Sequence, residues 1–416
     1  MQKVCVVGLG YIGLPTASLL ATKGFEVLGV DIRSQVVDTI NQGKIHIYEP
    51  DLDILVKAAV QSGNLKASLC SKESDVFILA VPTPFIEENK APDLSYVEAA
   101  TRSICASLKA GDLVILESTS PVGTTEKIAQ WISEERTDLV LPGRLSESHR
   151  ENQIYIAHCP ERVLPGNILK ELVENDRVVG GIDRPSSEKA FEFYSSFVSG
   201  EIFSTFSRTA EMAKLTENTF RDINIAFANE LSMISDELEI DVWELIRLAN
   251  RHPRVNILNP GPGVGGHCIA VDPWFIVNAA PKTALLTKKA REVNDSKPEW
   301  VIQKVLNHAD KMKTRTIGCL GLSFKANIDD LRESPSLAIV ESLAERTDYQ
   351  LMVVEPHIHS CPEILSGKKN VEFSDLQSAI QKSDIVLLLV DHDEFKEIDP
   401  KVFEERILID TRGAFA

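Results

Sequence analysis

The first 31 residues contain the pattern that most restricts the fold of this chain. An apolar run at residues 3–7 leads into a glycine-rich turn, Gly8-Leu9-Gly10-Tyr11-Ile12-Gly13, and a helical apolar pattern continues to about residue 23. A second apolar run at residues 26–30 ends at Asp31. The order strand, GxGxxG, helix, strand, acid is typical of the first βαβ unit of a doubly wound α/β sheet. The sequence therefore predicts a parallel sheet that begins with this unit.

The same residues predict a dinucleotide site. The three glycines of the turn provide a tight bend, let a pyrophosphate reach the helix N-terminus, and allow close packing of helix on strand. Asp31, eighteen residues past Gly13, can accept hydrogen bonds from both ribose hydroxyls. Because a carboxylate repels a 2′-phosphate, Asp31 favours NAD over NADP, whereas the nearby cation Arg33 would favour NADP.

Further apolar runs end in polar segments. Residues 76–81 precede Pro82-Thr83-Pro84, residues 113–117 precede a segment from Ser118 to Thr124, and residues 154–158 precede the charged exit Cys159-Pro160-Glu161-Arg162-Val163. Open α/β sheets bind ligands at the carboxyl ends of their strands, so these segments are candidate ligand contacts. Strand-to-helix turns with Ser or Thr caps are the structural alternative.

The C-terminal third repeats the pattern of the first. Strands are expected at residues 316–320, 350–354, 385–390 and 406–410, and a helix is expected at 336–345. This part has no GxGxxG and carries Phe324-Lys325 in the corresponding turn, with Arg332 just beyond. We therefore expect a second doubly wound unit that binds a different nucleotide.

The segment between the two units is predicted to be helical. Residues 208–250 contain no proline or glycine, and their apolar residues have helical spacing. Lys214, Asn218 and Arg221 follow at four and three residues, so they share one helix face. A solvated charged face and an anion or oxyanion site both fit this trio. The predicted architecture is α/β, with two Rossmann-like doubly wound parallel-sheet domains, 1–205 and 306–416, joined by a long central helix within a helical domain, 206–305.

A glycine-rich stretch with a cysteine lies at the end of the helical part. Within residues 253–274, a run of four glycines (Gly261, Gly263, Gly265, Gly266) and two prolines (Pro260, Pro262) leads up to Cys268. Glycines let backbone N–H groups approach an anion closely, and prolines stiffen the loop. Asp272 follows Cys268 by one helical turn and could act as a base near the thiol. The alternative is a structural turn followed by a buried cysteine.

Composition excludes several other classes of protein. The net charge of −17 disfavours nucleic acid and anionic membranes as partners. Seven cysteines at scattered positions without a CxxC pair argue for reduced thiols and against a zinc site or a disulfide framework, and no metal is expected. The longest apolar runs are strand-length and no signal peptide precedes Val4, so a cytoplasmic protein is expected.

Several motifs in one order carry a family resemblance over essentially the whole chain. They are GLGYIGLP, VPTP, ESTSPVGTT, CPERVLPG, AEMAKLTENTFRD, GPGVGGHCIAVDP and FKANIDDLRESPS. The chain resembles the UDP-sugar 6-dehydrogenases of the UDP-glucose/GDP-mannose dehydrogenase family. UDP-glucose members commonly have a lysine just before the aspartate that follows the cysteine, whereas Val271-Asp272 here is similar to the N-acetylhexosamine members.

The resemblance implies an activity. It is the oxidation, with two NAD, of the C6 hydroxyl of a UDP-N-acetylhexosamine, UDP-N-acetylmannosamine being the expected sugar, to the uronic acid for surface polysaccharide synthesis. A homodimer or higher oligomer built on the long helix is also implied, with Arg254 reaching a neighbouring site. UDP-N-acetylglucosamine and UDP-glucose remain alternative substrates. A two-electron dehydrogenase, which would not need the thiol, and a non-catalytic nucleotide-binding scaffold remain alternative classes.

The resemblance also assigns roles to residues. Cys268 would hold the aldehyde as a thiohemiacetal and then a thioester, Lys214 and Asn218 would donate a proton or stabilise an oxyanion, and Asp272 would activate water. Glu161 and Thr119 resemble neighbours of that water or of the nicotinamide. The implied substrate contacts are Arg162, Val163, Lys214, Asn218, Arg221, His252, Arg254, Gly263, Phe324, Lys325 and Arg412. The implied NAD contacts, beside the glycines and Asp31, are Tyr11, Ile12, Thr83, Thr124 and Arg332.

Overall fold

The computed structural model of the chain describes residues 2–86, 88–143, 152–164, 166–266, 268–312 and 316–416. The chain divides into two compact units, Met1–Glu217 and Asn218–Ala416, and the boundary falls inside the long helix α8 (Ser207–Glu237). The predicted three-part division, with a separate central helical domain at 206–305, stays a prediction.

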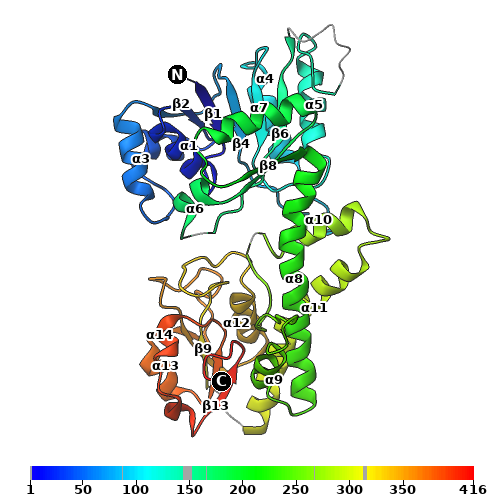
Figure 1. The fold of residues 1–416 in the computed structure, drawn as a ribbon. Coiled ribbons are helices and arrows are strands. Elements are labelled where there is room, and N and C mark those ends of the chain that lie inside the picture. The colour runs from blue at the N-terminus through cyan, green and yellow to red at the C-terminus, as the bar shows by residue number, and fades with distance from the viewer. Residues whose placement is uncertain (1, 87, 144–151, 165, 267, 313–315) are drawn as a thin grey trace. The chain divides into compact units, whose positions relative to one another are not determined.

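The first unit is built on an eight-stranded sheet (Figure 1) with the order β3-β2-β1-β4-β5-β6-β7-β8. The strands are β1 (Lys3–Val7), β2 (Glu26–Val30), β3 (Leu65–Ser68), β4 (Val76–Leu79), β5 (Leu113–Leu116), β6 (Tyr155–His158), β7 (Arg177–Gly181) and β8 (Ile202–Phe206). Its helices are α1 (Gly13–Thr22), α2 (Ser34–Asn41), α3 (Leu52–Gln61), α4 (Ser95–Cys105), α5 (Thr124–Glu135), α6 (Ile168–Glu174), α7 (Arg184–Ser195) and the first part of α8.

This topology confirms the predicted doubly wound fold and adds one correction. Strands β1 to β6 pair in parallel, and the order reverses between β1 and β4, where such sheets place their ligands. However, β7 pairs antiparallel with β6, so the sheet is mixed rather than purely parallel. The connection from β6 to β7 starts and ends at the same edge of the sheet, as it must between antiparallel neighbours.

Alternation along the central strand explains the two apolar layers of the first unit. Val4 and Val6 of β1 belong to the cluster under α1, α3, α6 and α7, whereas Cys5 and Val7 belong to the cluster under α4 and α5. All four residues of β4, VFIL, are buried. Both faces of the sheet are therefore covered by helices, which is why the central strands read as continuous apolar runs.

The second unit contains a five-stranded parallel sheet with the order β11-β10-β9-β12-β13, the order of the first five strands of the first sheet. The strands are β9 (Thr316–Leu320), β10 (Gln350–Val354), β11 (Val371–Phe373), β12 (Ile385–Leu388) and β13 (Ile407–Asp410). The helices, after the second part of α8, are α9 (Val242–Ala249), α10 (Asp272–Ala279), α11 (Leu285–Met312), α12 (Pro335–Arg346), α13 (Leu376–Lys382) and α14 (Asp393–Lys396), with a 3₁₀ turn at Pro400–Phe403. The expected repeat is confirmed.

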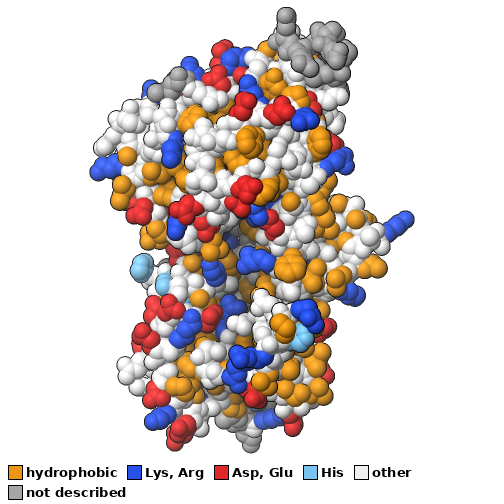
Figure 2. Space-filling model, in the orientation of Figure 1, with side chains coloured by type: hydrophobic (Ala, Val, Ile, Leu, Met, Phe, Trp, Pro, Cys, Tyr) orange, Lys and Arg blue, Asp and Glu red, His pale blue; other side chains and the backbone are white. Residues whose placement is uncertain are grey.

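The predicted helical segment is two helices, α8 and α9. Acidic, basic and apolar side chains are interspersed over the visible face of each unit (Figure 2). Within the described residues, no helix combines the length and the apolar character that a membrane span requires.

Candidate active site

The turn after β1 has the backbone of a dinucleotide-binding loop. Gly8 has φ of 93°, and a Cβ there would lie 2.5 Å from the Ala80 oxygen. A Cβ on Gly13 would lie 1.8 Å from the Gly8 oxygen. At Gly10, by contrast, a Cβ would meet no described atom within 4 Å. Packing therefore requires the first and third glycines, while the second leaves an open approach to the start of α1, as a bound pyrophosphate requires.

Asp31 lies at the end of β2 with its carboxylate aimed at this turn. It is 7% exposed and accepts hydrogen bonds from the Leu9 N–H at 3.2 Å and the Arg33 N–H at 3.0 Å. The Arg33 Nε donates to it at 3.2 Å. Burial opposes ionisation of Asp31, but the hydrogen bonds from Arg33 and Leu9 outweigh it and hold the pKa below its ordinary value. An ionised acceptor at this place fits the ribose of NAD.

The polar ends of β4 and β5 meet because these strands are neighbours in the sheet. The Thr83 hydroxyl donates to the Thr119 carbonyl at 2.5 Å. The Thr124 hydroxyl is buried and donates to the Pro121 carbonyl at 2.6 Å, so it stabilises its own turn. Tyr11 and Ile12 lie at the start of α1, with Tyr11 exposed. The predicted contacts Tyr11, Thr83 and Thr119 thus lie at the carboxyl edge of the sheet, and their roles stay predictions.

Glu161 lies in a buried charged cluster that the sequence did not reveal. The Arg177 Nη1 donates to Glu161 Oε2 at 2.8 Å, and both side chains are buried. Glu117, at the end of β5, accepts a hydrogen bond from the Tyr194 hydroxyl at 2.7 Å. Burial and the nearby Glu161 raise the pKa of Glu117 to about 7. Glu117 begins the ESTSPVGTT motif, a signal that could have directed attention to it, whereas Arg177 has no comparable signal.

Arg162 and Val163 follow Glu161 on the same exit. Arg162 Nη2 lies 2.6 Å from Glu217 Oε1, and the Arg162 carbonyl accepts from Asn175 at 3.1 Å. Val163 is half-buried against the core of the first unit. The structure therefore uses Val163 in packing and presents Arg162 in an ion pair with α8.

In the second unit, three predicted catalytic residues lie together. Asp272 is the first residue of α10, is 3% exposed, and accepts a hydrogen bond from Asn218 Nδ2 at 2.5 Å. Its N–H donates to the Cys268 carbonyl at 2.9 Å, so one turn separates the carboxylate from the cysteine. Cys268 is exposed, which contradicts the alternative of a buried structural cysteine. The Cys268 thiol and the Asp272 carboxylate therefore lie in one short segment, and a buried hydrogen bond joins the Asn218 amide to that carboxylate.

The glycine loop, residues 260–266, packs on the segment that follows β9. A Cβ on Gly265 would lie 2.3 Å from the Glu333 oxygen, and one on Gly266 would lie 3.0 Å from the Phe324 ring. Gly263, with φ of 151°, borders Pro335, and Gly261 borders the Arg412 guanidinium. The structure thus brings together Gly263, Phe324, Arg412 and the segment of Cys268, which the sequence separates by up to about 150 residues.

The other predicted residues occupy more open positions. Lys214 is half-exposed on α8, and Arg221, His252, Arg254, Lys325 and Arg332 are exposed. Arg332 Nη2 lies 2.5 Å from Asp330. Burial lowers the pKa of Arg412, although Asp391 lies 3.2 Å from its Nε. The Arg412 guanidinium, which borders Gly261, is suited to binding a diphosphate.

The second unit repeats the backbone turn of the first, but its own His392 lies against Glu355, the acidic residue that corresponds to Asp31. Gly321 has φ of 95°, and the Leu322 N–H donates to Glu355 at 2.7 Å, as Leu9 does to Asp31. His392 Nε2, however, lies 3.1 Å from Glu355 Oε1, and both side chains are buried. The chain's own imidazole thus covers the carboxylate that would bind a ribose, in agreement with the expectation of a different nucleotide.

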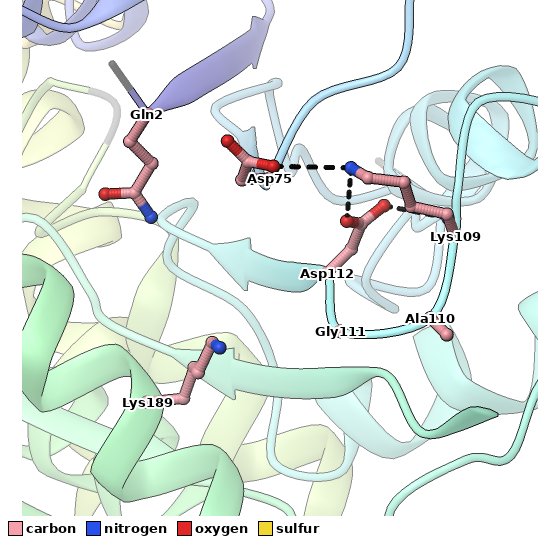
Figure 3. Close-up of a pocket in the computed structure, with 7 residues that line it drawn as sticks. All are labelled: Gln2, Asp75, Lys109, Ala110, Gly111, Asp112 and Lys189. Carbon is pink, nitrogen blue, oxygen red and sulfur yellow. Dashed lines mark hydrogen bonds and ion pairs between the residues drawn. The ribbon is translucent and has the colours of Figure 1, made fainter. Parts of the chain in front are cut away.

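A hollow of about 340 Å³ lies on the other edge of the first sheet (Figure 3). It is formed by residues that precede β1, β4 and β5, such as Gln2, Asp75 and Asp112. Three of its charged side chains pair with one another, with Lys109 Nζ 2.8 Å from Asp112 and 3.4 Å from Asp75 (Figure 3). It contains none of the predicted site residues. The amino ends of parallel strands do not form the ligand edge of such sheets.

Comparisons with known proteins agree with this geometry. Models of the UDP-glucose/GDP-mannose dehydrogenase family match its NAD binding domain at residues 2–198, its central domain at 208–296 and its UDP binding domain at 318–416. The chain is 58% identical over 415 residues, covering 100% of it and 96% of the relative, to an NDP-N-acetyl-D-galactosaminuronic acid dehydrogenase of Ralstonia nicotianae. It is 57% identical over 397 residues, 95% of this chain and 97% of the relative, to a UDP-N-acetyl-D-mannosamine dehydrogenase of Campylobacter jejuni.

A solved structure extends the likeness to the fold. The UDP-D-ManNAc dehydrogenase of Pyrococcus horikoshii superposes with a TM-score of 0.87 at 38% identity, covering 100% of this chain and 96% of that one. The matched regions include both Rossmann-like sheets and the glycine loop with Cys268. The chain therefore belongs to the UDP-glucose/GDP-mannose dehydrogenase family and is an NAD-dependent UDP-sugar dehydrogenase.

Proposed function

We propose that this enzyme converts a UDP-N-acetylhexosamine to its uronic acid in a four-electron oxidation through Cys268. The observation that carries the proposal is the arrangement in the second unit, where Asn218 Nδ2 donates to Asp272 at 2.5 Å and the Asp272 N–H donates to the Cys268 carbonyl at 2.9 Å. An exposed thiol one turn from a buried carboxylate suits attack on an aldehyde. A two-electron dehydrogenase would not need the thiol.

The chemistry proceeds in four steps: a first oxidation, addition of the thiol, a second oxidation and hydrolysis. NAD, when bound, accepts a hydride from the sugar C6 in each oxidation. In the first, the C6 hydroxyl loses its proton to a base and becomes an aldehyde. The Cys268 sulfur then forms a C–S bond to C6, and its proton passes to the C6 oxygen. In the second oxidation the thiohemiacetal loses a hydride and its hydroxyl proton and becomes a thioester. Water then breaks the C–S bond, releasing the carboxylate and restoring the thiol.

The residues of this chain are assigned to these steps by position and charge. Lys214 would stabilise the C6 oxyanion or donate a proton, with Asn218 as its polar partner. Asp272 would take the proton from the attacking water, because it is the buried carboxylate nearest in sequence to the thiol. Glu161 and Thr119 would contact that water or the nicotinamide. The uridine diphosphate would lie against Phe324, Lys325 and Arg412, near the glycine loop.

UDP-N-acetylmannosamine is the proposed substrate, supported by the Val271-Asp272 pair and by the Campylobacter and Pyrococcus relatives. The Ralstonia relative, named for an N-acetylgalactosaminuronic acid, favours a galacto-configured sugar as the second candidate. Comparing kcat/KM for UDP-N-acetylmannosamine, UDP-N-acetylglucosamine, UDP-N-acetylgalactosamine and UDP-glucose decides among them. We expect the first to exceed UDP-glucose at least tenfold, and the reverse order would refute the assignment.

The covalent step is tested by stoichiometry. Wild-type enzyme should give two NADH per uronic acid, whereas Cys268→Ala should give at most one NADH per sugar and no acid. Cys70→Ala is the matched control, since Cys70 is also exposed but lies in the first unit. Lys214→Ala should slow turnover by about 10²–10³-fold, the scale of one oxyanion donor, without changing the stoichiometry. A Cys268→Ala enzyme that still forms the acid near the wild-type rate would remove covalent catalysis from the proposal.

The proposal includes a homodimer or higher oligomer built on α8 and a role in surface polysaccharide synthesis. Phe220, Phe227 and Ile234 recur every seven residues on α8 and are 67%, 49% and 43% exposed. Such a stripe on one helix face is typical of an association surface. Light scattering of the purified enzyme measures its mass, and a monomer at micromolar concentration would contradict this part.

A further inference from the structure

A chain of buried hydrogen bonds in the second unit ends on the glycine loop. The Gly261 N–H donates to Asn229 Oδ1 at 2.8 Å, and Asn229 Nδ2 donates to Asn294 Oδ1 at 2.9 Å. Asn294 Nδ2 then donates to Asp222 Oδ1 at 2.8 Å, which also accepts from Arg291 at 2.6 Å. Asp222 and Asn229 lie on α8, and Arg291 and Asn294 lie on α11. All four side chains are at most 1% exposed.

The two ends of this chain fix the orientation of its members. Gly261 offers an N–H, which can only donate, and the Asp222 oxygen accepts from two donors. Each asparagine between them must therefore present its oxygen toward Gly261 and its NH₂ toward Asp222. Neither amide can rotate without leaving two buried polar groups unpaired, which is unfavourable. The network therefore has one arrangement and holds Gly261 in one place.

Gly261 is the point of the loop where a side-chain anchor is needed. Pro260 and Pro262 flank it and have no N–H, so Gly261 carries the single amide proton of this tripeptide. Gly261 is buried and lies outside helices and strands, so its N–H has no hydrogen-bond partner from regular secondary structure. A Cβ at Gly261 would lie 2.6 Å from Arg412 Nη1, so the loop backbone borders that guanidinium. A displacement of Gly261 would therefore change the backbone surface that the Arg412 guanidinium contacts.

Helix α11 contacts the loop a second time, one turn further on. Pro298, four residues after Asn294, lies 3.2 Å from the position of a Cβ on Gly263. Asn294, through Asn229, and Pro298 thus border the loop at Gly261 and Gly263. Two contacts spaced by one helical turn define both the position and the direction of the backbone between them.

We propose that Asn229 and Asn294 are positioning residues that hold the glycine loop and Arg412 in the arrangement that binds the UDP moiety. The inference rests on the proposed function to the extent that this loop takes part in the UDP-sugar site. Neither residue needs to contact the substrate, because both act through the Gly261 N–H. If the network only stabilised the fold, removing it would lower the free energy of unfolding but would not weaken UDP binding more than NAD binding.

The first test uses variants and binding calorimetry. Asn229→Leu keeps the side-chain volume and removes both hydrogen bonds. Asn224→Leu is the matched control, since Asn224 lies on the same helix but donates to its own helix backbone, the Phe220 carbonyl, at 2.6 Å. We expect the Kd for UDP to rise at least tenfold in Asn229→Leu while the Kd for NAD changes less than twofold, and neither Kd to change in Asn224→Leu. A folded Asn229→Leu enzyme with wild-type UDP affinity would overturn the inference.

The second test needs no variant to fold. Hydrogen exchange of wild-type enzyme, followed by mass spectrometry of peptides spanning residues 258–264, reports on Gly261 with few other amides because two residues are prolines. We expect protection of the Gly261 amide by at least about 10²-fold, in line with a buried hydrogen bond in a stable network. Exchange at the unprotected rate would overturn the inference. UDP affinity and Gly261 protection do not depend on sugar oxidation, so failure of the proposed function would appear separately, as absent NADH formation with every UDP-sugar.

Discussion

Glu117 is a buried carboxyl that should leave a signature in the stability of the protein. It is 1% exposed, accepts a hydrogen bond from Tyr194, and lies near Glu161, which forms an ion pair with Arg177. Burial and Glu161 raise the pKa of Glu117 from 4.5 to about 7 in the folded protein. In the unfolded chain the carboxyl ionises near its ordinary pKa of roughly 4.3. Between these values the folded protein holds a proton that the unfolded chain has lost.

The sign of the pH dependence follows from this difference. As pH rises from about 4.5 to 7, the unfolded state releases the proton first, so wild-type stability falls through this window by on the order of 3 kcal/mol. Below the window and above it, the contribution of Glu117 is constant. Glu117→Gln keeps an acceptor for Tyr194 and has no proton to lose. We therefore expect the variant to become more stable relative to wild type as pH rises across the window.

Urea unfolding at several pH values measures this effect. Glu192→Gln is the control, because Glu192 is exposed on α7, the helix that carries Tyr194. The difference in unfolding free energy between Glu192→Gln and wild type should stay nearly constant with pH. Parallel curves for Glu117→Gln and wild type would mean that folding does not raise the pKa of Glu117.

At the scale of elements, helix α5 begins without a capping side chain of its own. Its N-cap is Gly123, and the buried Glu211 of α8 supplies the missing acceptor. Glu211 accepts from the Gly123 N–H at 2.6 Å, the Thr125 N–H at 2.8 Å and the Thr125 hydroxyl at 2.6 Å. A carboxylate at a helix N-terminus is also favoured by the helix dipole.

Glu211→Ala should therefore destabilise the turn that leads from β5 into α5. Three donors, two of them buried, would lose their acceptor, and we expect a loss of at least about 2 kcal/mol of unfolding free energy. Because the same turn carries Thr119 and Thr124, KM for NAD should rise as well. Glu230→Ala, at an exposed position of the same helix, is the control for both measurements. A Glu211→Ala enzyme with unchanged stability would show that solvent replaces the cap.

The sequence predicted elements best where a local pattern determines them. Residues 3–7, 26–30, 316–320 and 350–354 are strands with the predicted bounds, because buried parallel strands read as apolar runs. Two features had no such pattern: the edge strand β8, none of whose residues is fully buried, and the antiparallel direction of β7. Their pairing is decided by neighbours distant in sequence, which a local window cannot show.

The candidate site divides in the same way. The glycines of the first turn, Asp31 and Cys268 were recognisable because motif spacing fixes their chemistry. Glu117, Asn229 and Arg177 were missed, because each is one polar residue in an apolar stretch or at its end, and only the tertiary contact shows its partner. Similarly, the acid Glu355 at the end of β10 matches Asp31 in the sequence pattern, and the structure shows His392 covering it.

At the scale of the whole molecule, the two Rossmann-like sheets imply a division of labour between ligands. Asp31 lies in the first unit beside an open glycine turn, whereas Arg412 lies in the second beside the glycine loop. A ligand that binds only the folded state stabilises it by mass action, by about 2.7 kcal/mol at a hundred times its Kd. Each ligand should therefore raise the Tm of wild-type enzyme independently.

Exchanging one residue in each unit should separate the two effects. Asp31→Ala removes a charged acceptor for two ribose hydroxyls, whose hydrogen bonds are worth roughly 1.5–3 kcal/mol each. The Tm increase given by a fixed NAD concentration should therefore largely disappear. The difference in affinity between NAD and NADP should also become smaller. The Tm increase given by UDP should persist. Arg412→Ala should show the opposite pattern, losing the response to UDP and keeping that to NAD. Thermal unfolding of both variants with each ligand makes four comparisons, and Asp38→Ala, at an exposed position of α2, is the charge-matched control for Asp31→Ala. Loss of both responses in either variant would mean that the two sites do not act separately, and an unchanged NAD response in Asp31→Ala would place the ribose acceptor elsewhere.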